Sequence, residues 1–158
     1  MVPVRSGAGS DTLSSRRIAF ATAAWLYLAG VVVQVFFAGA SLFDLTDWTI
    51  HTGLGWGLGS APLLLVMLAL LARVDRRTGW LTAALAVAAM IQPELAAARD
   101  DSPVVAAFHP VNALIVFWLA WVVARRSTVH VRQVRDPATD ALAVPISDAP
   151  PPPSAGAA

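Results

Sequence analysis

The sequence contains no cysteine and no lysine. The absence of cysteine excludes disulfides, thiolate metal ligands and a cysteine nucleophile. Only 13% of the 158 residues are charged, about half the share found in an average soluble domain. All eleven cations are arginines and the net charge is +1, a balance that predicts no nucleic-acid partner.

What the chain has in abundance is apolar sequence, at 57% of its residues. Four apolar runs are each about 20 residues long, the length of a membrane-spanning helix. We expect an all-α, four-helix transmembrane up-down bundle over residues 16–126, with helices at about 18–39, 49–72, 79–98 and 104–124. Residues 1–15 and the Pro/Ala-rich tail at 127–158 are expected to lack regular structure.

The arginines are divided unequally between the two sides of this bundle. Ten precede the first run, lie between the second and third, or follow the fourth, and only Arg99 lies on the other side. The positive-inside rule therefore predicts that both termini are cytoplasmic, in a multi-pass protein of the inner (plasma) membrane. We expect the lipid bilayer as its main partner, with another membrane or redox subunit as a further one.

The first apolar run ends in "FFAGAS", a small-x-small pattern like that of a signal-peptidase site. The run before it is longer than the apolar core of a signal peptide. We therefore expect the first helix to be retained as an anchor and not cleaved after Ala40.

Each predicted helix carries one polar residue at a similar depth near the outer side. Gln34 and Gln92 lie near the ends of the first and third helices, and His51 and His109 lie near the starts of the second and fourth. Each glutamine precedes its histidine by 17 residues, and the two pairs are 58 residues apart. This spacing is compatible with duplication of a helix hairpin, and polar groups inside a membrane usually face the bundle interior.

The second and fourth helices of such a bundle are diagonal to each other, so His51 and His109 face each other across its interior. Two histidines in this arrangement can ligate the iron of a haem b placed between them. Gly55 and Ala113 each lie one turn deeper on the same face, where a small side chain lets a flat cofactor approach the helix.

Three further features complete this hypothesis. Gln34 and Gln92 belong to the same polar ring, and Arg99 is suited to pair with haem propionates, or equally with Asp100, Asp101 or Glu94. Gly53 and Gly57 form a small-xxx-small pattern that predicts close packing against a neighbouring helix.

A second interpretation needs no cofactor. A histidine near a helix end can reach interfacial water, and the glutamines can join helices by hydrogen bonds. The polar ring then binds a quinone or another small molecule, or stabilises the assembly. The sequence has neither a G-x-G-x-x-G nor a Walker loop, and no Ser/His/Asp set shares a plausible site, so no catalytic residues are predicted.

At "QVFFAGA", "HTGLG" and "HPVNAL" the chain resembles an uncharacterised family of small four-helix bacterial membrane proteins. The resemblance covers roughly residues 17–126. It implies the four-helix architecture and no known activity. It marks as recurring positions Gln34, His51, Gly55, Gln92, His109 and Pro110.

A looser resemblance is to one half of a haem A synthase, or to membrane cytochrome b bundles. There, histidines on the second and fourth helices hold a haem near the outer face, and His51 and His109 fit that pattern. The synthase has a glutamate three residues before its first histidine, where this chain has Trp48, and it has loop cysteines that this chain lacks. The likeness therefore implies haem binding and not haem-modifying chemistry.

Overall fold

The computed structural model describes residues 8–135, and every regular element within them is helical. The helices are α1 (Ala8–Leu42), α2 (Trp48–Leu71), α3 (Arg76–Ala97), the single-turn α4 (Pro103–Ala106) and α5 (Phe108–Arg135). Four of the described segments are long and apolar enough to cross a membrane: Thr12–Leu42, Trp48–Leu71, Arg76–Ala97 and Pro103–Val129. The predicted all-α, four-helix membrane fold is confirmed.

Helix starts and ends follow local capping chemistry. The carboxylates of Asp47 and Asp75 accept hydrogen bonds from the backbone N–H groups of Thr49 and Thr78, at 2.8 Å and 3.1 Å, and so fix the starts of α2 and α3. The chain leaves α1 and α2 through left-handed residues, Asp44 (φ 57°) and Arg73 (φ 49°). Each reversal also contains the six-to-one backbone hydrogen bond of a Schellman motif.

Both outer helices are longer than the sequence predicts. α1 begins ten residues before position 18, and α5 continues eleven residues past position 124. Residues 8–15 and 127–135 are therefore helical, contrary to expectation, because a spanning helix supplies the nucleus and each added residue gains a hydrogen bond. The predictions for residues 1–7 and 136–158 lie outside the described residues.

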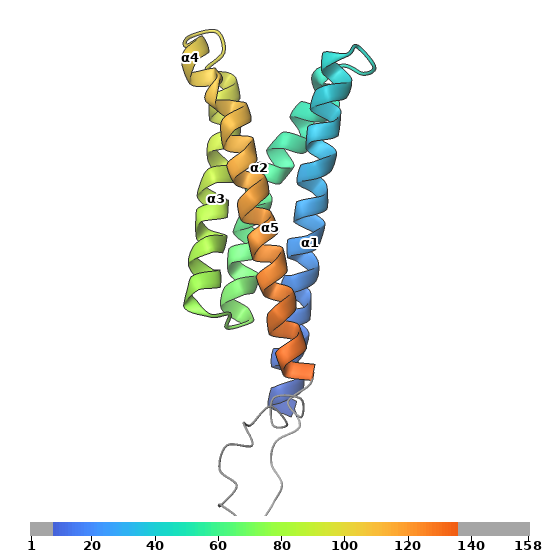
Figure 1. Ribbon diagram of the computed structural model, residues 1–158, viewed down its shortest axis with the longest axis vertical. Coiled ribbons are helices and arrows are strands. Elements are labelled where there is room, and N and C mark those ends of the chain that lie inside the picture. The colour runs from blue at the N-terminus through green and yellow to red at the C-terminus, as the bar shows by residue number, and fades with distance from the viewer. Residues whose placement is uncertain (1–7, 136–158) are drawn as a thin grey trace, which may run out of the picture.

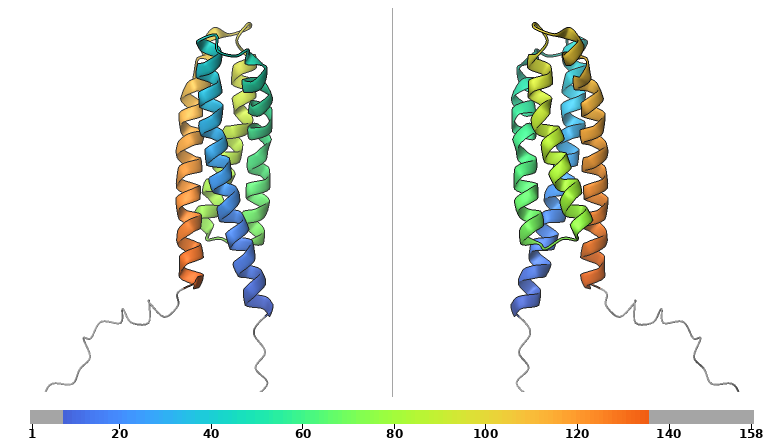
Figure 2. Two further views of the ribbon diagram at one scale, coloured as in Figure 1. Left: turned by 90° about the vertical axis from the view of Figure 1, so that its right-hand side faces the viewer. Right: turned by 90° about the vertical axis from the view of Figure 1, so that its left-hand side faces the viewer.

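The helices form a ring in the order α1, α2, α3, α5, and each packs against its two neighbours. α2 and α5 are therefore diagonal, as predicted. Figures 1 and 2 show the start of α1 and the end of α5 at the same end of the bundle, here called the terminal end. The opposite end, called the loop end, carries the α1–α2 loop and α4 (Figure 1).

The buried core fills mainly the terminal half of the bundle. Phe20, Leu85 and Val123, from three different helices, are at most 1% exposed. The rest of the core comes from segments of α1, α2, α3 and α5 at the same level. Toward the loop end, the α1–α2 pair and the α3–α5 pair spread apart (Figure 1). The outward surface carries many exposed large apolar side chains, which suits contact with lipid.

Candidate functional site

A cavity of about 530 Å³ lies between the helices in the loop half of the bundle. α1, α2, α3 and α5 all line it, mostly with apolar side chains, and Tyr27 and Val116 connect it to the buried core. Its lining includes Gln34, His51, Gln92 and His109, so the structure brings together the whole predicted polar ring, with Tyr27 and Thr52 as further polar residues. A volume of this size is typical of pockets that bind cofactors and other small organic molecules.

His51 and His109 face each other across this cavity. Their ring centres are 6.5 Å apart and their ring planes are inclined by 71°. Both side chains are partly buried. The two rings come from α2 and α5, which are diagonal in the bundle, so the rings approach each other across its interior.

Each histidine ring is held by the helix that precedes it. Nδ1 of His51 lies 3.2 Å from the backbone oxygen of Gln34, and Nδ1 of His109 lies 3.1 Å from that of Gln92. A carbonyl oxygen only accepts hydrogen bonds, so in a neutral ring the proton is on Nδ1. Nε2 then keeps its lone pair and is the nitrogen available to a ligand or metal ion.

Most residues that line the cavity form pairs with one constant spacing in the sequence. Eighteen of its twenty-one lining residues form nine pairs whose members are 58 residues apart in the chain. Gly55 pairs with Ala113, for example, and Val35 with Pro93. The α1–α2 and α3–α5 hairpins therefore contribute equivalent positions, which supports the duplicated-hairpin interpretation and gives the cavity an approximate twofold symmetry.

The two glutamine side chains break this symmetry. Nδ2 of Asn112 donates to Oε1 of Gln92 (2.6 Å) and to the backbone oxygen of Ala88 (2.8 Å), which ties α5 to α3. Nε2 of Gln34 donates to the backbone oxygen of His51 (2.7 Å), but Oε1 of Gln34 is buried and has no hydrogen-bond partner. The position equivalent to Asn112 is Leu54.

Part of this chain matches a known protein family. Residues 34–98 match DUF6220, a family of unknown function. The predicted resemblance to an uncharacterised family is thereby confirmed. No match was found among curated proteins or among solved structures.

The DUF6220 match begins at Gln34 and ends just after α3, so it contains His51, Gly55 and Gln92. His109 and Asn112 lie beyond it, on α5. The match therefore covers three of the four residues of the predicted polar ring, and the structure adds the fourth, His109.

The glycines of α2 within the DUF6220 match lie on two different faces of the helix. A Cβ atom on Gly55 would lie 3.0 Å from Nε2 of Gln34, and one on Gly59 would lie 3.4 Å from the backbone oxygen of Ala89. Gly53 and Gly57 are exposed, with nothing within 4 Å of a Cβ placed there. The prediction that Gly53 and Gly57 pack against a helix is wrong, because that face of α2 points away from its neighbours.

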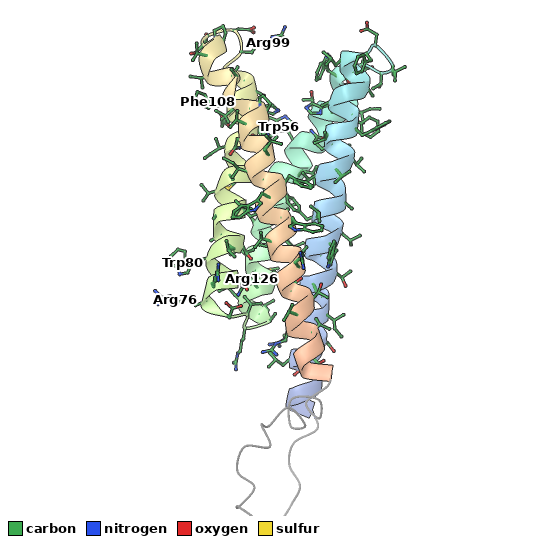
Figure 3. All side chains as sticks on the ribbon, viewed as in Figure 1. Trp56, Arg76, Trp80, Arg99, Phe108 and Arg126 are labelled. Atoms are coloured by element: carbon green, nitrogen blue, oxygen red, sulfur yellow. The ribbon has the colours of Figure 1, made fainter. Side chains whose placement is uncertain are left out.

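The remaining predicted site residues are divided between the cavity and the exposed surface. Gly55 and Ala113 line the cavity, as expected. Arg99 is exposed and is not among the lining residues, and Figure 3 shows it at the loop end, beyond Trp56 along the bundle. Sequence reasoning did not assign Asn112 to the site, although it lies three residues after His109, on nearly the same helix face. Trp48 was likewise missed as a contact of His51, with the two ring centres 5.5 Å apart.

Within the described residues, no three His, Cys, Asp or Glu side chains come together as a metal site. Among these residues, His51 and His109 can therefore offer two protein ligands to one ion.

Proposed function

We propose that this protein is a membrane cytochrome subunit that binds a b-type haem through His51 and His109. The observation that carries the proposal is the separation of the two rings. Metal–imidazole bonds are about 2.0–2.1 Å long and each ring centre is about 1.15 Å beyond its nitrogen, so two rings on opposite sides of one ion have centres about 6.3–6.5 Å apart. The observed separation is 6.5 Å.

The hydrogen bonds of the histidines suit the same role. Metal-ligating histidines usually donate their second ring N–H to a carbonyl or carboxylate, which fixes the tautomer and the ring orientation. Here the backbone oxygens of Gln34 and Gln92 accept from the two Nδ1 atoms. The rings are thus positioned with Nε2 free before any ligand binds.

The cavity suits a flat, largely apolar cofactor. Its lining is mostly aliphatic and small, and its approximate twofold symmetry offers similar walls to the two faces of a planar ring. Gly55 and Ala113, one turn from each histidine, add little or no side chain there. A haem supplies one-electron redox chemistry when bound, and two protein ligands on its iron favour electron transfer. His51 and His109 would hold its iron, and the mostly apolar lining of the cavity would surround it.

The alternative is a cofactor-free polar ring that joins the helices or binds a quinone. The bonds from Asn112 to Gln92 and Ala88 are of the kind that an assembly role requires. An absorbance spectrum separates this alternative from haem binding, because a cofactor-free protein is colourless.

The test uses full-length protein purified in detergent from haem-replete cells. We expect a Soret band and, on reduction, the sharp α and β bands of a low-spin haem. His51→Ala and His109→Ala should each abolish these sharp bands. His130→Ala is the matched control, because His130 is the third histidine and lies on α5 near the terminal end. Colourless protein that also gives no low-spin spectrum with added hemin would overturn the proposal.

A further inference from the structure

The α1–α2 and α3–α5 hairpins are joined covalently at one end of the bundle. The link is the short connection between α2 and α3 at residues 72–75, which lies toward the terminal end. The α1–α2 loop and the connection that contains α4 lie at the loop end, but each joins helices of a single hairpin (Figure 1). No stretch of the described chain therefore crosses between the hairpins at the loop end.

The hydrogen bonds of the loop half follow the same division. Gln34 bonds His51 inside the α1–α2 hairpin. Gln92 bonds His109 and Asn112 inside the α3–α5 hairpin. Within residues 8–135, no side-chain hydrogen bond of this half crosses from one hairpin to the other. Parting the hairpins here therefore breaks no such bond.

The terminal half, in contrast, holds the two hairpins together. Nε1 of Trp25 on α1 donates to Oγ1 of Thr128 on α5 (2.9 Å). Trp25 also packs edge-on against Trp121 of α5, with ring centres 6.1 Å apart. The buried core lies at the same end. This half is therefore a fixed base from which the hairpins extend as two arms.

The cavity between the arms reaches the outer surface of the bundle. Among its lining residues, Val35 of α1 is 59% exposed and Leu114 of α5 is 70% exposed. α1 and α5 are neighbours that belong to different hairpins, and we call the boundary between them the α1–α5 seam. Both residues lie in segments long and apolar enough to span a membrane. The cavity therefore meets the hydrocarbon of the bilayer along this seam.

The opposite seam, between α2 and α3, has a close contact and a larger side chain at its border. A Cβ atom on Gly59 would lie 3.4 Å from the backbone oxygen of Ala89 and from Cγ of Pro93. Trp56 of α2 also lines the cavity. Trp56 and Leu114 are 58 residues apart and so are equivalent in the two hairpins. The smaller side chain of this pair borders the α1–α5 seam.

From this arrangement we infer that the cavity is loaded sideways from the bilayer. The hairpins part in the loop half, and a flat, apolar molecule dissolved in the lipid enters between Val35 and Leu114. The lining contains no Asp, Glu or Arg, so entry desolvates none of these charged groups. The identity of the guest rests on the proposed haem site, whereas the movement of the hairpins is a property of the chain alone.

Cross-linking of introduced cysteines tests the route, because the chain has none of its own. A short bismaleimide between Val35→Cys and Leu114→Cys closes the α1–α5 seam. We expect hemin transfer from phosphatidylcholine vesicles to the haem-free protein, followed by Soret absorbance, to slow about tenfold or more. The control joins Thr22→Cys to Val131→Cys, on the same two helices beside one groove of the terminal half. It should leave the rate unchanged.

A reciprocal pair of variants tests which seam is used. Leu114→Trp gives the α1–α5 seam the indole that its counterpart carries, and should slow hemin transfer from vesicles about three- to tenfold. Trp56→Leu makes the opposite change at the α2–α3 seam and should not slow transfer. Equal rates in the two variants, or slowing by Trp56→Leu alone, would overturn the assignment of the seam.

Spin labels on the same cysteine pairs give a readout that needs no haem. In haem-free protein in lipid nanodiscs, pulsed dipolar electron paramagnetic resonance should give a broad distance distribution for the Val35→Cys and Leu114→Cys pair. The Thr22→Cys and Val131→Cys pair should give a narrow one. Two equally narrow distributions overturn the inference.

Two further outcomes separate this inference from the proposed function. If protein cross-linked across the α1–α5 seam takes up hemin as fast as protein without the cross-link, the guest enters from the aqueous loop end and the inference is wrong. If wild-type protein takes up no hemin although the labels at Val35→Cys and Leu114→Cys give a broad distribution, the proposed function fails and the movement of the hairpins stands.

Discussion

At the scale of single residues, a histidine becomes a useful ligand when its ring is fixed and one nitrogen is free. The backbone oxygens of Gln34 and Gln92 fix the two rings through Nδ1. This arrangement explains why each glutamine precedes its histidine by 17 residues: the two positions meet across an antiparallel hairpin. The glutamine side chains then act separately, one tied to Asn112 and the other bonded to the backbone of His51.

The glycines of α2 provide a matched test at this scale. Gly55→Ala places a methyl group 3.0 Å from Nε2 of Gln34, so the amide must shift. This shift offsets the helix-propensity gain of alanine, so we expect Gly55→Ala to be less stable than Gly57→Ala and to bind hemin more weakly. Gly57→Ala meets open space and should stabilise α2 by about 0.8–1.0 kcal/mol. Thermal unfolding by circular dichroism and hemin titration in detergent measure both effects, and equal behaviour of the two variants contradicts the assigned faces.

At the scale of helices, the start of α2 determines the position of His51, which lies three residues after Trp48, the first residue of the helix. The Asp47 carboxylate accepts from the Thr49 N–H and caps this start. The hydrogen bond from the Thr49 backbone holds the pKa of Asp47 below its ordinary value. A carboxyl with a lowered folded-state pKa contributes stability that is present above its unfolded pKa and is lost as the pH falls through its folded pKa.

Asp47→Asn keeps a side-chain oxygen to cap α2 but removes the titration. We expect the wild type to lose more stability than Asp47→Asn between neutral pH and a pH below the lowered pKa of Asp47. Asp47→Ala should be less stable than either at neutral pH, because it has no cap. Unfolding curves measured across this pH range check the prediction, and parallel pH profiles of wild type and Asp47→Asn contradict it.

The ends of the helices could be predicted from the sequence, but the faces by which the helices pack could not. Each apolar run had to form a helix because lipid cannot satisfy free backbone polar groups, and the predicted limits of α2 differ from the observed ones by one residue at each end. Which face of α2 meets another helix was not predictable in the same way. The faces of Gly53 and Gly57 depend on helix rotation, which side-chain packing sets. For the same reason, Asn112 was visible as a polar residue but not as the partner of Gln92.

The α3–α5 contact at the terminal end gives a further prediction at this scale. Arg126 donates through Nε to Thr78 Oγ1 (2.9 Å) and through Nη2 to Asp75 Oδ1 (3.2 Å), and Thr78 is fully buried. Arg126→Ala removes both hydrogen bonds and should lower the free energy of unfolding by about 1–2 kcal/mol. Arg77→Ala, at an exposed position, should change it by less than about 0.5 kcal/mol. Similar losses in the two variants would rule out this role for Arg126.

At the scale of the whole molecule, the buried core and the cavity lie in different halves of the bundle. The terminal half contains the buried core, and the loop half contains the cavity between two related hairpins. A rigid half can therefore hold the helices in register while the other half keeps a space between the two histidines. The sequence predicted the bundle and the matching depth of the histidines, but the distance between the rings depends on how far the hairpins spread.

The most direct test of the shared-iron site is low-temperature electron paramagnetic resonance of the ferric, haem-loaded protein. Two imidazole ligands give a low-spin ferric signal, and ring planes inclined by 71° should make it strongly anisotropic, unlike the rhombic signal of parallel rings. His130→Ala should keep this signal, and His51→Ala should convert it to a high-spin one. A wild-type protein that shows only high-spin iron, or retains no iron when loaded with hemin, contradicts the assignment of His51 and His109 as ligands of one ion.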